Sequence, residues 1–164
     1  DNGGDGYVAA RHLVQFGYSV DVINFKQPEK PHFLNLIKAC SANGINIWTY
    51  KDDENLQKNF ISILDKDYDM IVDGIFGFSF KGPLKPPYDK LFVDLKGIKT
   101  PIFSIDNPSG WEIEKGIENK VNKNCLGNVY DTFEPKYVIS LTLPKICMKG
   151  FKGVHYVGGR FIPK

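Results

Sequence analysis

The chain of 164 residues is long enough for one compact domain with a real core, and its apolar content of 42% and charged content of 24% are ordinary for a globular protein. Its 21 basic and 19 acidic residues leave a net charge of +2, and no stretch gathers basic residues into a stripe, so binding of nucleic acid is not indicated. No apolar run approaches the ~20 residues of a membrane span, so we expect no membrane insertion.

Helix and strand patterns alternate along the chain. Apolar residues at helical spacing predict helices over residues 8–16, 33–40, 56–64 and 88–95. Asp5 is expected to cap the first helix, and Gly17 to end it. Runs of apolar and β-branched residues predict strands over residues 19–25, 45–50, 68–78, 100–110, 137–143 and 155–161.

This alternation predicts the α/β class, with a mainly parallel sheet and helices on both faces. The strand at 68–78 is apolar enough for burial on both faces. Residues 111–136 have no clear periodicity, and a solvated insertion is favoured there over a functional lid. In such folds ligands bind beyond the carboxyl ends of the strands, so the segments that follow the strands matter most.

The cysteines and histidines give no metal-binding pattern. Three cysteines, far apart and odd in number, fit reduced thiols in an intracellular compartment: Cys40, Cys125 and Cys147. His12, His32 and His155 lack ligand-like spacing, so structural or exposed roles are expected for them.

The chain opens on NGGDG, residues 2–6, directly before the first predicted helix. Successive glycines can turn backbone N–H groups inward, and a helix N-terminus adds partial positive charge, so the segment can cradle a phosphate. A tight turn in which Asp5 merely caps the helix explains the glycines equally well.

The segment DGIFGFSFKG, residues 73–82, ends the most apolar predicted strand. A carboxylate buried at Asp73 would need a partner or a cation. Phe78 and Phe80 could flank a planar ring, although core positions are the more frequent role of such residues.

Two later strands end in polar segments. SIDNPSG, residues 104–110, places Asp106 and Ser109 where catalytic carboxylates are often found, with an ordinary Asp-Asn-Pro turn as the alternative. LTLPK ends at Lys145, for which a solvated side chain is expected. Together Asn2, Asp73, Asp106 and Ser109 are predicted to meet at one edge of the sheet, as an oxygen-rich set suited to a hard cation.

Five motifs in this order, NGGDGYVAARHL, IVDGIFGFSFKG, PIFSIDNPSGW, YVISLTLPK and HYVGGRFIP, resemble the NAD(P)H-hydrate epimerase family, whose domain is called the YjeF N-terminal domain. The resemblance implies a Rossmann-like three-layer αβα sandwich with a mainly parallel sheet. It also implies that residues 1–164 form a single such domain, which begins after the family's N-terminal helix and first strand.

The resemblance implies an isomerase that interconverts the R and S epimers of NADH or NADPH hydrated at C6 of the nicotinamide ring. A separate dehydratase then regenerates the cofactor from the S form. Family members are usually homodimers and intracellular, which leaves cytoplasm and mitochondrion as alternatives for this chain.

The family's functional residues carry over by motif. Potassium would be held by Asn2, Asp73 and Ser109, and Asp106 would serve as general acid and base. The substrate-binding positions would be Asp1, Asn2, Gly3, Gly4, Asp5, Gly77, Phe78, Ser79, Phe80, Lys81, Gly82, Pro83 and Asp106. This chain departs from the family at Asp1, where asparagine is usual, and at Asn107, where an apolar residue is common.

Two other functions fit part of the pattern. The same domain occurs as a noncatalytic dimerisation and RNA-binding scaffold in enhancers of mRNA decapping, but the retained NGGDG, Asp73 and Asp106 favour an enzyme. A redox dehydrogenase is a weaker alternative because the full G-x-G-x-x-G fingerprint is absent from the sequence.

Overall fold

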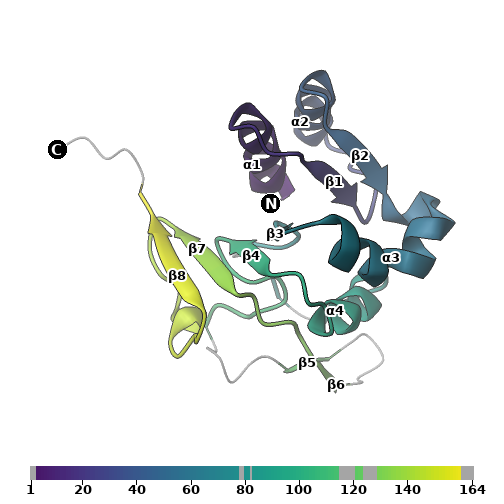
Figure 1. Cartoon of the computed structure of the whole chain (residues 1–164). Coiled ribbons are helices and arrows are strands. Elements are labelled where there is room, and N and C mark those ends of the chain that lie inside the picture. The colour runs from purple at the N-terminus through teal and green to yellow at the C-terminus, as the bar shows by residue number, and fades with distance from the viewer. Residues whose placement is uncertain (1–2, 78–79, 82, 115–120, 124–128, 160–164) are drawn as a thin grey trace.

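The computed structural model describes residues 3–77, 80–81, 83–114, 121–123 and 129–159 (Figure 1). Its helices are α1 Gly3–Gln15, α2 Pro31–Ala42, α3 Glu54–Asp67 and α4 Tyr88–Lys96, with 3₁₀ turns η1 Tyr50–Asp52 and η3 Ile146–Met148. Its strands are β1 Asp21–Asn24, β2 Asn46–Thr49, β3 Ile71–Asp73, β4 Ile102–Ile105, β5 Val121–Lys123, β6 Val129–Asp131, β7 Tyr137–Leu141 and β8 Val154–Gly158. None of these helices is both long and apolar enough to cross a membrane.

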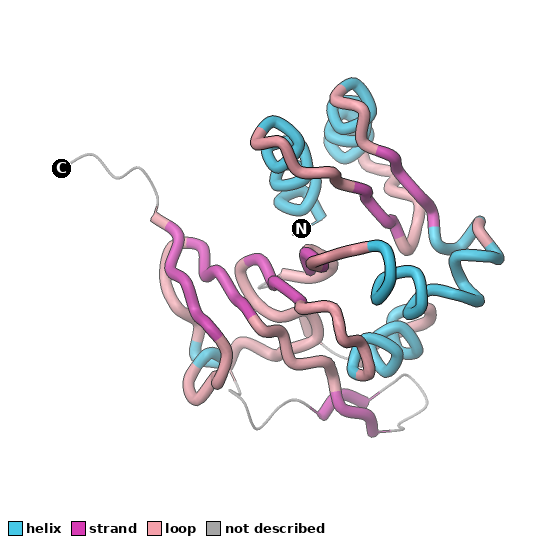
Figure 2. Tube along the Cα trace, viewed as in Figure 1, coloured by secondary structure: helices cyan, strands magenta, loops and turns pink. Residues whose placement is uncertain are grey.

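The strands form a mainly parallel arrangement, so the predicted α/β class is confirmed. β1 pairs with β2 in parallel, and a second parallel sheet has the order β3-β4-β7-β8. The long helices gather around β1, β2 and β3, whereas loops and the short η3 lie beside β7 and β8 (Figure 2). The pair β5 and β6 is antiparallel and separate.

Strand β1 lies between two helical layers. Val22 packs into the cluster that contains residues of α1 and α2, and its neighbour Ile23 packs into the cluster built on α3 and α4. Because successive side chains of a strand point to opposite faces, the two clusters cover opposite faces of β1. This is the layering of an αβα sandwich.

Helix boundaries follow local signals with one exception. α1 is followed by Gly17 at φ 92°, a left-handed conformation that favours glycine, as predicted. Asp53 caps α3, since its carboxylate accepts a hydrogen bond of 2.8 Å from the backbone N–H of Leu56. The prediction that Asp5 caps α1 is wrong, because the helix begins at Gly3 and Asp5 lies inside its first turn.

The strand predicted over 68–78 is much shorter in the structure. β3 contains only Ile71–Asp73, and Val72 is 40% exposed, so burial on both faces is wrong as well. The strand ends because the Asp73 carboxylate accepts a hydrogen bond from the N–H of Ile75, which turns the chain away from the sheet.

The segment 111–136 is not simply a solvated insertion, so that prediction is wrong for its described parts. It contains the antiparallel pair β5 and β6, and Trp111 at its start and Phe133 near its end are buried. The indole of Trp111 donates to the carbonyl of Phe133, whose ring packs edge-on against Phe92 in the main core. Residues 115–120 and 124–128 lie outside the described ranges.

Candidate functional site

The ends of β3 and β4 and the start of α1 meet at one rim of the molecule. A Cβ on Gly6, in the first turns of α1, would lie 3.9 Å from the Cα of Gly74, which directly follows β3. Partial burial raises the pKa of Asp5, and the negative charge of Asp106 raises it further, so these two carboxyl groups are close enough to interact. Of the four residues predicted to meet at one edge of the sheet, Asp73 and Ser109 are in contact, and Asp106 follows β4, which is paired in parallel with β3. Asn2 lies outside the described residues.

Asp73 is the centre of a buried polar cluster at the end of β3. One carboxylate oxygen, Oδ1, accepts from the Ser109 hydroxyl at 2.5 Å and from the N–H of Ile75 at 3.2 Å. The other, Oδ2, accepts from the Ser104 hydroxyl at 2.8 Å and from the N–H of Ser109 at 2.9 Å. All four donors are uncharged, so they fix the carboxylate without neutralising it.

Burial raises the pKa of Asp73 above 3.8, and it outweighs the hydrogen bonds, which lower the pKa. Only 3% of the residue is exposed, and within the described ranges no Lys, Arg or His side chain pairs with it. A buried carboxylate without a positive partner is costly, so a cation would stabilise this cluster. Carboxylate and hydroxyl oxygens are the donors that a hard cation prefers, so Asp73 and Ser109 fit a potassium ion chemically.

Ser109 reaches Asp73 because the chain turns tightly after β4. The next residue, Gly110, has φ 87°, and a Cβ there would lie 2.6 Å from the ring of Phe92. Only glycine fits that position without displacing the core. The Ser109 hydroxyl also accepts a hydrogen bond of 2.8 Å from the N–H of Phe76, which ties the segments after β3 and β4 together.

Asp106 follows β4 in an unusual backbone conformation. Its φ is 70°, a left-handed value that few non-glycine residues adopt but that aspartate and asparagine tolerate best. Its N–H donates to the carbonyl of Ile139 in β7 at 2.7 Å, which holds the residue against the neighbouring strand. Backbone strain of this kind is found most often at functional sites.

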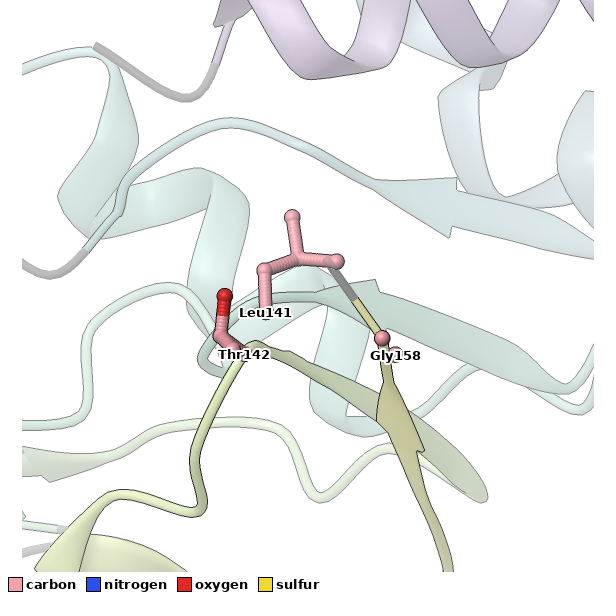
Figure 3. A pocket seen from close by; sticks show the side chains of 4 residues that line it. Leu141, Thr142 and Gly158 are labelled. Atoms are coloured by element: carbon pink, nitrogen blue, oxygen red, sulfur yellow. The ribbon is translucent and has the colours of Figure 1, made fainter. Parts of the chain in front are cut away.

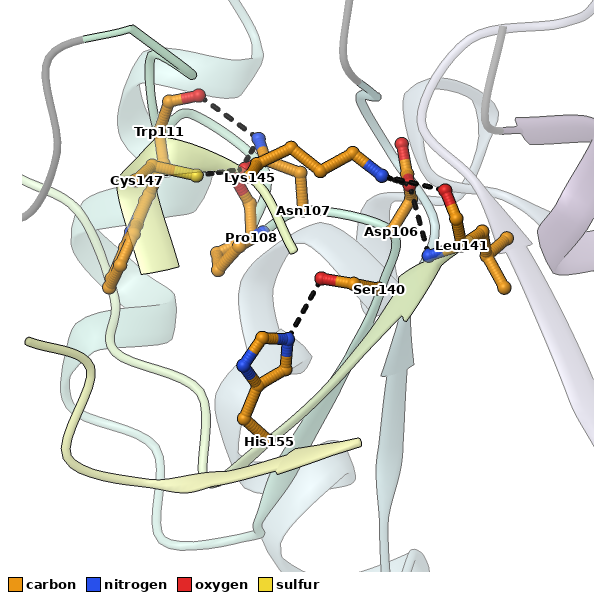
Figure 4. A network of polar contacts seen from close by, with 9 residues as sticks. All are labelled: Asp106, Asn107, Pro108, Trp111, Ser140, Leu141, Lys145, Cys147 and His155. Atoms are coloured by element: carbon orange, nitrogen blue, oxygen red, sulfur yellow. Dashed lines mark hydrogen bonds and ion pairs between the residues drawn. The ribbon is translucent and has the colours of Figure 1, made fainter. Parts of the chain in front are cut away.

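The Asp106 carboxylate forms an ion pair with Lys145 (Figure 4). Its Oδ1 contacts the Lys145 ammonium and also accepts a 3.4 Å contact from the N–H of Leu141. Among the described residues, its Oδ2 accepts no hydrogen bond. Asp106 therefore has one oxygen held by a cation and one oxygen available to a ligand.

Lys145 is not the solvated lysine that its sequence position suggested, so that prediction is wrong. Its side chain is 16% exposed, and its ammonium donates to the carbonyl of Leu141 at 2.8 Å besides contacting Asp106. The burial arises because the chain folds back after β7 and brings the lysine over the end of β4 (Figure 4).

An open hollow of about 460 Å³ lies at the ends of β7 and β8. Leu141, Thr142, Gly158 and Gly159 line it, and Figure 3 shows the first three of these residues around it. Its volume lies in the range of small-molecule sites. Leu141 belongs to its wall and contacts both Asp106 and Lys145 through its backbone, so the ion pair and the hollow adjoin.

A second polar network fixes the loop that carries Asp106 (Figure 4). The buried Asn107 side chain donates to the carbonyls of Pro108 and Trp111, and it accepts from the Cys147 thiol at 2.7 Å. Burial raises the pKa of Cys147 to about 11, so the thiol stays protonated and serves as a donor. The Asn107 side chain thus has a structural role in this loop.

The remaining predicted site residues have varied surroundings. Gly3 and Gly4 open α1, Gly77 is buried, and Lys81 and Pro83 are exposed. Phe80 is half-buried and stacks on Phe76 with a centroid distance of 4.9 Å, beside the main core. Asp1, Asn2, Phe78, Ser79 and Gly82 lie outside the described residues.

Sequence reasoning missed two residues of the rim, Ser104 and Lys145. Ser104 is fully buried, and its hydroxyl faces Asp73 from the adjacent strand. A lone serine inside the apolar run PIFSI was the available signal. For Lys145 the signal was its place shortly after a strand of the same sheet, because such loops converge.

Comparison with known proteins gives a consistent result. The family described as YjeF-related protein N-terminus matches residues 1–147. NAD(P)H-hydrate epimerase of Paramecium tetraurelia is 46% identical over 99% of this chain and 60% of its own length. The protein of the same name in Dictyostelium discoideum is 45% identical over 100% of this chain and 63% of its own length.

Comparison with a solved structure indicates the same family. The crystal structure of yeast ynu0, YNL200c, superposes with a TM-score of 0.82 and 34% identity, and covers 99% of this chain and 64% of the yeast chain. The chain therefore spans between three fifths and two thirds of the proteins that it matches. With a family match over nearly all of its residues and a shared fold, the chain belongs to the family of YjeF-related N-terminal domains.

Proposed function

We propose that the protein is an NAD(P)H-hydrate epimerase, which interconverts the R and S epimers of hydrated NADH and NADPH. The observation that carries the proposal is the buried Asp106–Lys145 pair beside the hollow at the ends of β7 and β8. The names of the relatives support it, since two of them with about 45% identity carry that name.

The reaction requires proton transfer at an oxygen atom. C6 of the hydrate carries a hydroxyl group next to the ring nitrogen, so inversion proceeds through loss and return of that hydroxyl or through opening of the ring. Either route needs a group that accepts and returns a proton. Asp106 suits this task because its Oδ2 is available among the described residues while its Oδ1 is held in place.

The start of α1 is suited to the anionic part of the substrate. Gly3 and Gly4 begin the helix, whose first N–H groups lack partners within the helix and carry partial positive charge. The negative charge of Asp106 raises the pKa of Asp5 in the first turn of this helix, which supports a role for this helix end near Asp106. We assign the substrate phosphates to this end of α1.

Potassium would be held by Asp73 and Ser109, with Asn2 as a third ligand. When bound, the ion supplies positive charge to a carboxylate that the described residues leave without a charged partner. The two protein groups in turn fix the segments after β3 and β4, through the contacts of Ser109 with Asp73 and Phe76. A homodimer that delivers the S epimer to a separate dehydratase completes the proposal.

The test is to incubate each purified epimer of hydrated NADPH, and then of hydrated NADH, with the protein and to separate the epimers by chromatography over time. We expect both epimers to approach the same mixture far faster than in buffer, and faster with potassium than with sodium. Spontaneous rates only, together with RNA binding at physiological salt, would support a noncatalytic scaffold instead.

A further inference from the structure

The ion pair between Lys145 and Asp106 is largely shielded from water. The exposed fractions of the two side chains are 16% and 7%, far below the 73% and 86% of the helix-surface pair Lys58–Glu54. Surface pairs contribute little, whereas an ammonium and a carboxylate shielded from water depend on each other for their charges. The pair therefore exists as lysine ammonium and aspartate carboxylate.

This charge state divides the chemistry between the two residues. An ionised carboxylate accepts hydrogen bonds only, so in this resting state Asp106 can take a proton, and it can return one only after it has taken it up. Loss of the C6 hydroxyl needs the opposite, a proton delivered to the departing oxygen. Among the described residues, the proton-bearing side chain in contact with Asp106 is Lys145.

One of the three N–H bonds of the Lys145 ammonium has no acceptor among the described residues. The ammonium carries three N–H bonds, and the described residues use two, one toward Asp106 and one toward the carbonyl of Leu141. Leu141 also lines the hollow, so the ammonium contacts a residue of its wall. Figure 3 shows Leu141 at the hollow, and Figure 4 shows its contact with Lys145. The third N–H therefore has no partner in the described part of the chain and can donate to a bound molecule.

We propose that Lys145 is the general acid of the reaction and Asp106 its general base, an inference that rests on the proposed function. In the forward step the ring nitrogen supplies its electron pair, the C6–O bond breaks, and an N–H bond of Lys145 breaks as its proton joins the leaving oxygen. The products are water, a ring cation and a neutral lysine amine.

The return step restores both residues. Water forms a new C6–O bond on the opposite face of the ring, and its surplus proton passes to the Asp106 carboxylate. That proton then moves to the Lys145 amine across the contact between the two side chains. No proton or electron is gained or lost over the cycle, and no other reactant is needed.

Replacement of Lys145 by arginine separates proton donation from simple neutralisation. Arginine keeps a positive charge beside Asp106, but it does not release a proton in proteins. For Lys145→Arg we expect KM within about threefold of the wild type and kcat lower by about 10²-fold or more. Lys149→Met, which removes an exposed lysine from the same segment, is the matched control and should leave both constants unchanged.

Chemical rescue gives a second measurement that a purely structural lysine would not affect. For Lys145→Ala, added methylammonium should restore part of the lost kcat, whereas added guanidinium should not. Wild-type kcat in Lys145→Arg, or equal rescue by the two cations, would overturn the proposal and reduce Lys145 to a counter-ion, with the epimerase function intact. Absence of epimerisation by the wild-type protein would instead refute the proposed function, and this inference with it.

Discussion

The end of β3 and the end of β4 each bury an aspartate, but the surroundings of the two carboxylates differ. Asp73 accepts hydrogen bonds on both oxygens from four uncharged donors, whereas Asp106 has a cation on one oxygen and no described partner on the other. Full use of its oxygens makes Asp73 a rigid anchor for the loops. Asp106 keeps one oxygen that the described residues leave unused, which is why we propose it as the reacting carboxylate.

The comparison predicts that loss of Asp106 affects the reaction most. Asp106→Asn keeps the size of the side chain, and asparagine also tolerates the left-handed backbone at φ 70°. Because the amide cannot serve as a base, we expect the epimerisation rate to fall by about 10²–10⁴-fold. Circular dichroism should show a folded protein.

Asp69→Asn is the matched control, since Asp69 is an exposed aspartate near the start of β3. It should keep the wild-type rate. A full rate in Asp106→Asn would contradict the division of roles between the two strand ends.

Loss of the Asp73 carboxylate should affect stability. Each oxygen accepts one backbone N–H, from Ile75 or from Ser109, so the amide group of Asp73→Asn faces an N–H in either orientation. A buried donor left without an acceptor costs about 1–3 kcal/mol, so we expect a loss of about 2 kcal/mol in the free energy of unfolding. Urea denaturation measures it.

Ser104→Ala is the variant with which the loss of stability in Asp73→Asn should be compared. It removes one of the four donors and leaves the carboxylate intact, so its cost should be smaller, about 1 kcal/mol. An Asp73→Asn protein no less stable than Ser104→Ala would show that Asp73 is not the anchor described here.

Potassium should distinguish the two strand ends further. If Asp73 and Ser109 hold the ion, potassium at about ten times its dissociation constant stabilises the folded protein by about 1.4 kcal/mol. For a domain of this size that corresponds to a rise in Tm of about 3–6 °C. Sodium at equal ionic strength serves as the control, and the rise should be lost in Asp73→Asn but kept in Asp106→Asn. A rise that persists in Asp73→Asn places the ion elsewhere.

The helices and their order could be predicted from the sequence because their signals are local. Gly17 and Gly44, for example, mark helix ends through their own positive φ angles. The short β3 could not be predicted, because its end depends on hydrogen bonds that the Asp73 carboxylate accepts from the N–H of Ile75 and from the hydroxyl of Ser109, 36 residues away. The apolar pattern of a strand does not show which side chains will end the strand.

The site was predicted in the same uneven way. The positions of Asp73, Asp106 and Ser109 after two neighbouring strands could be predicted because strand ends in a parallel sheet meet at one edge, whereas their roles stay a prediction. The pairing of Lys145 with Asp106 joins residues 39 positions apart. The place of Lys145 after a strand of the same sheet puts it near the site, but it does not specify its partner or its burial. Charge partners of this kind become visible only when the chain is folded.

The smallest expected effect concerns a third carboxylate, that of Asp65. Its comparison with Asp73 distinguishes the influence of hydrogen bonds on a carboxyl pKa from the influence of burial. Asp65 accepts from the N–H of Lys99 and from the N–H and hydroxyl of Thr100 at 2.8–3.1 Å. The bond from the Thr100 N–H is the main reason that the pKa of Asp65 is lowered below 3.8. Asp73 has similar uncharged donors, but its burial raises the pKa. The direction in which the pKa shifts therefore depends on burial and not on the number of hydrogen-bond donors.

The opposite pKa shifts of Asp65 and Asp73 can be measured from the dependence of the free energy of unfolding on pH. Below pH 3.8 the unfolded chain takes up a proton at Asp65 more readily than the folded protein, so Asp65 contributes stability that is lost as the pH falls through its lowered pKa. Urea titrations between about pH 2.5 and 5 should show a shallower acid loss for Asp65→Asn than for the wild type. For Asp73 the raised pKa keeps the proton on the folded protein, so without potassium its contribution to stability decreases as the pH rises. Identical acid slopes for the wild type and Asp65→Asn would mean that uncharged donors do not lower a carboxyl pKa here, even where burial is slight.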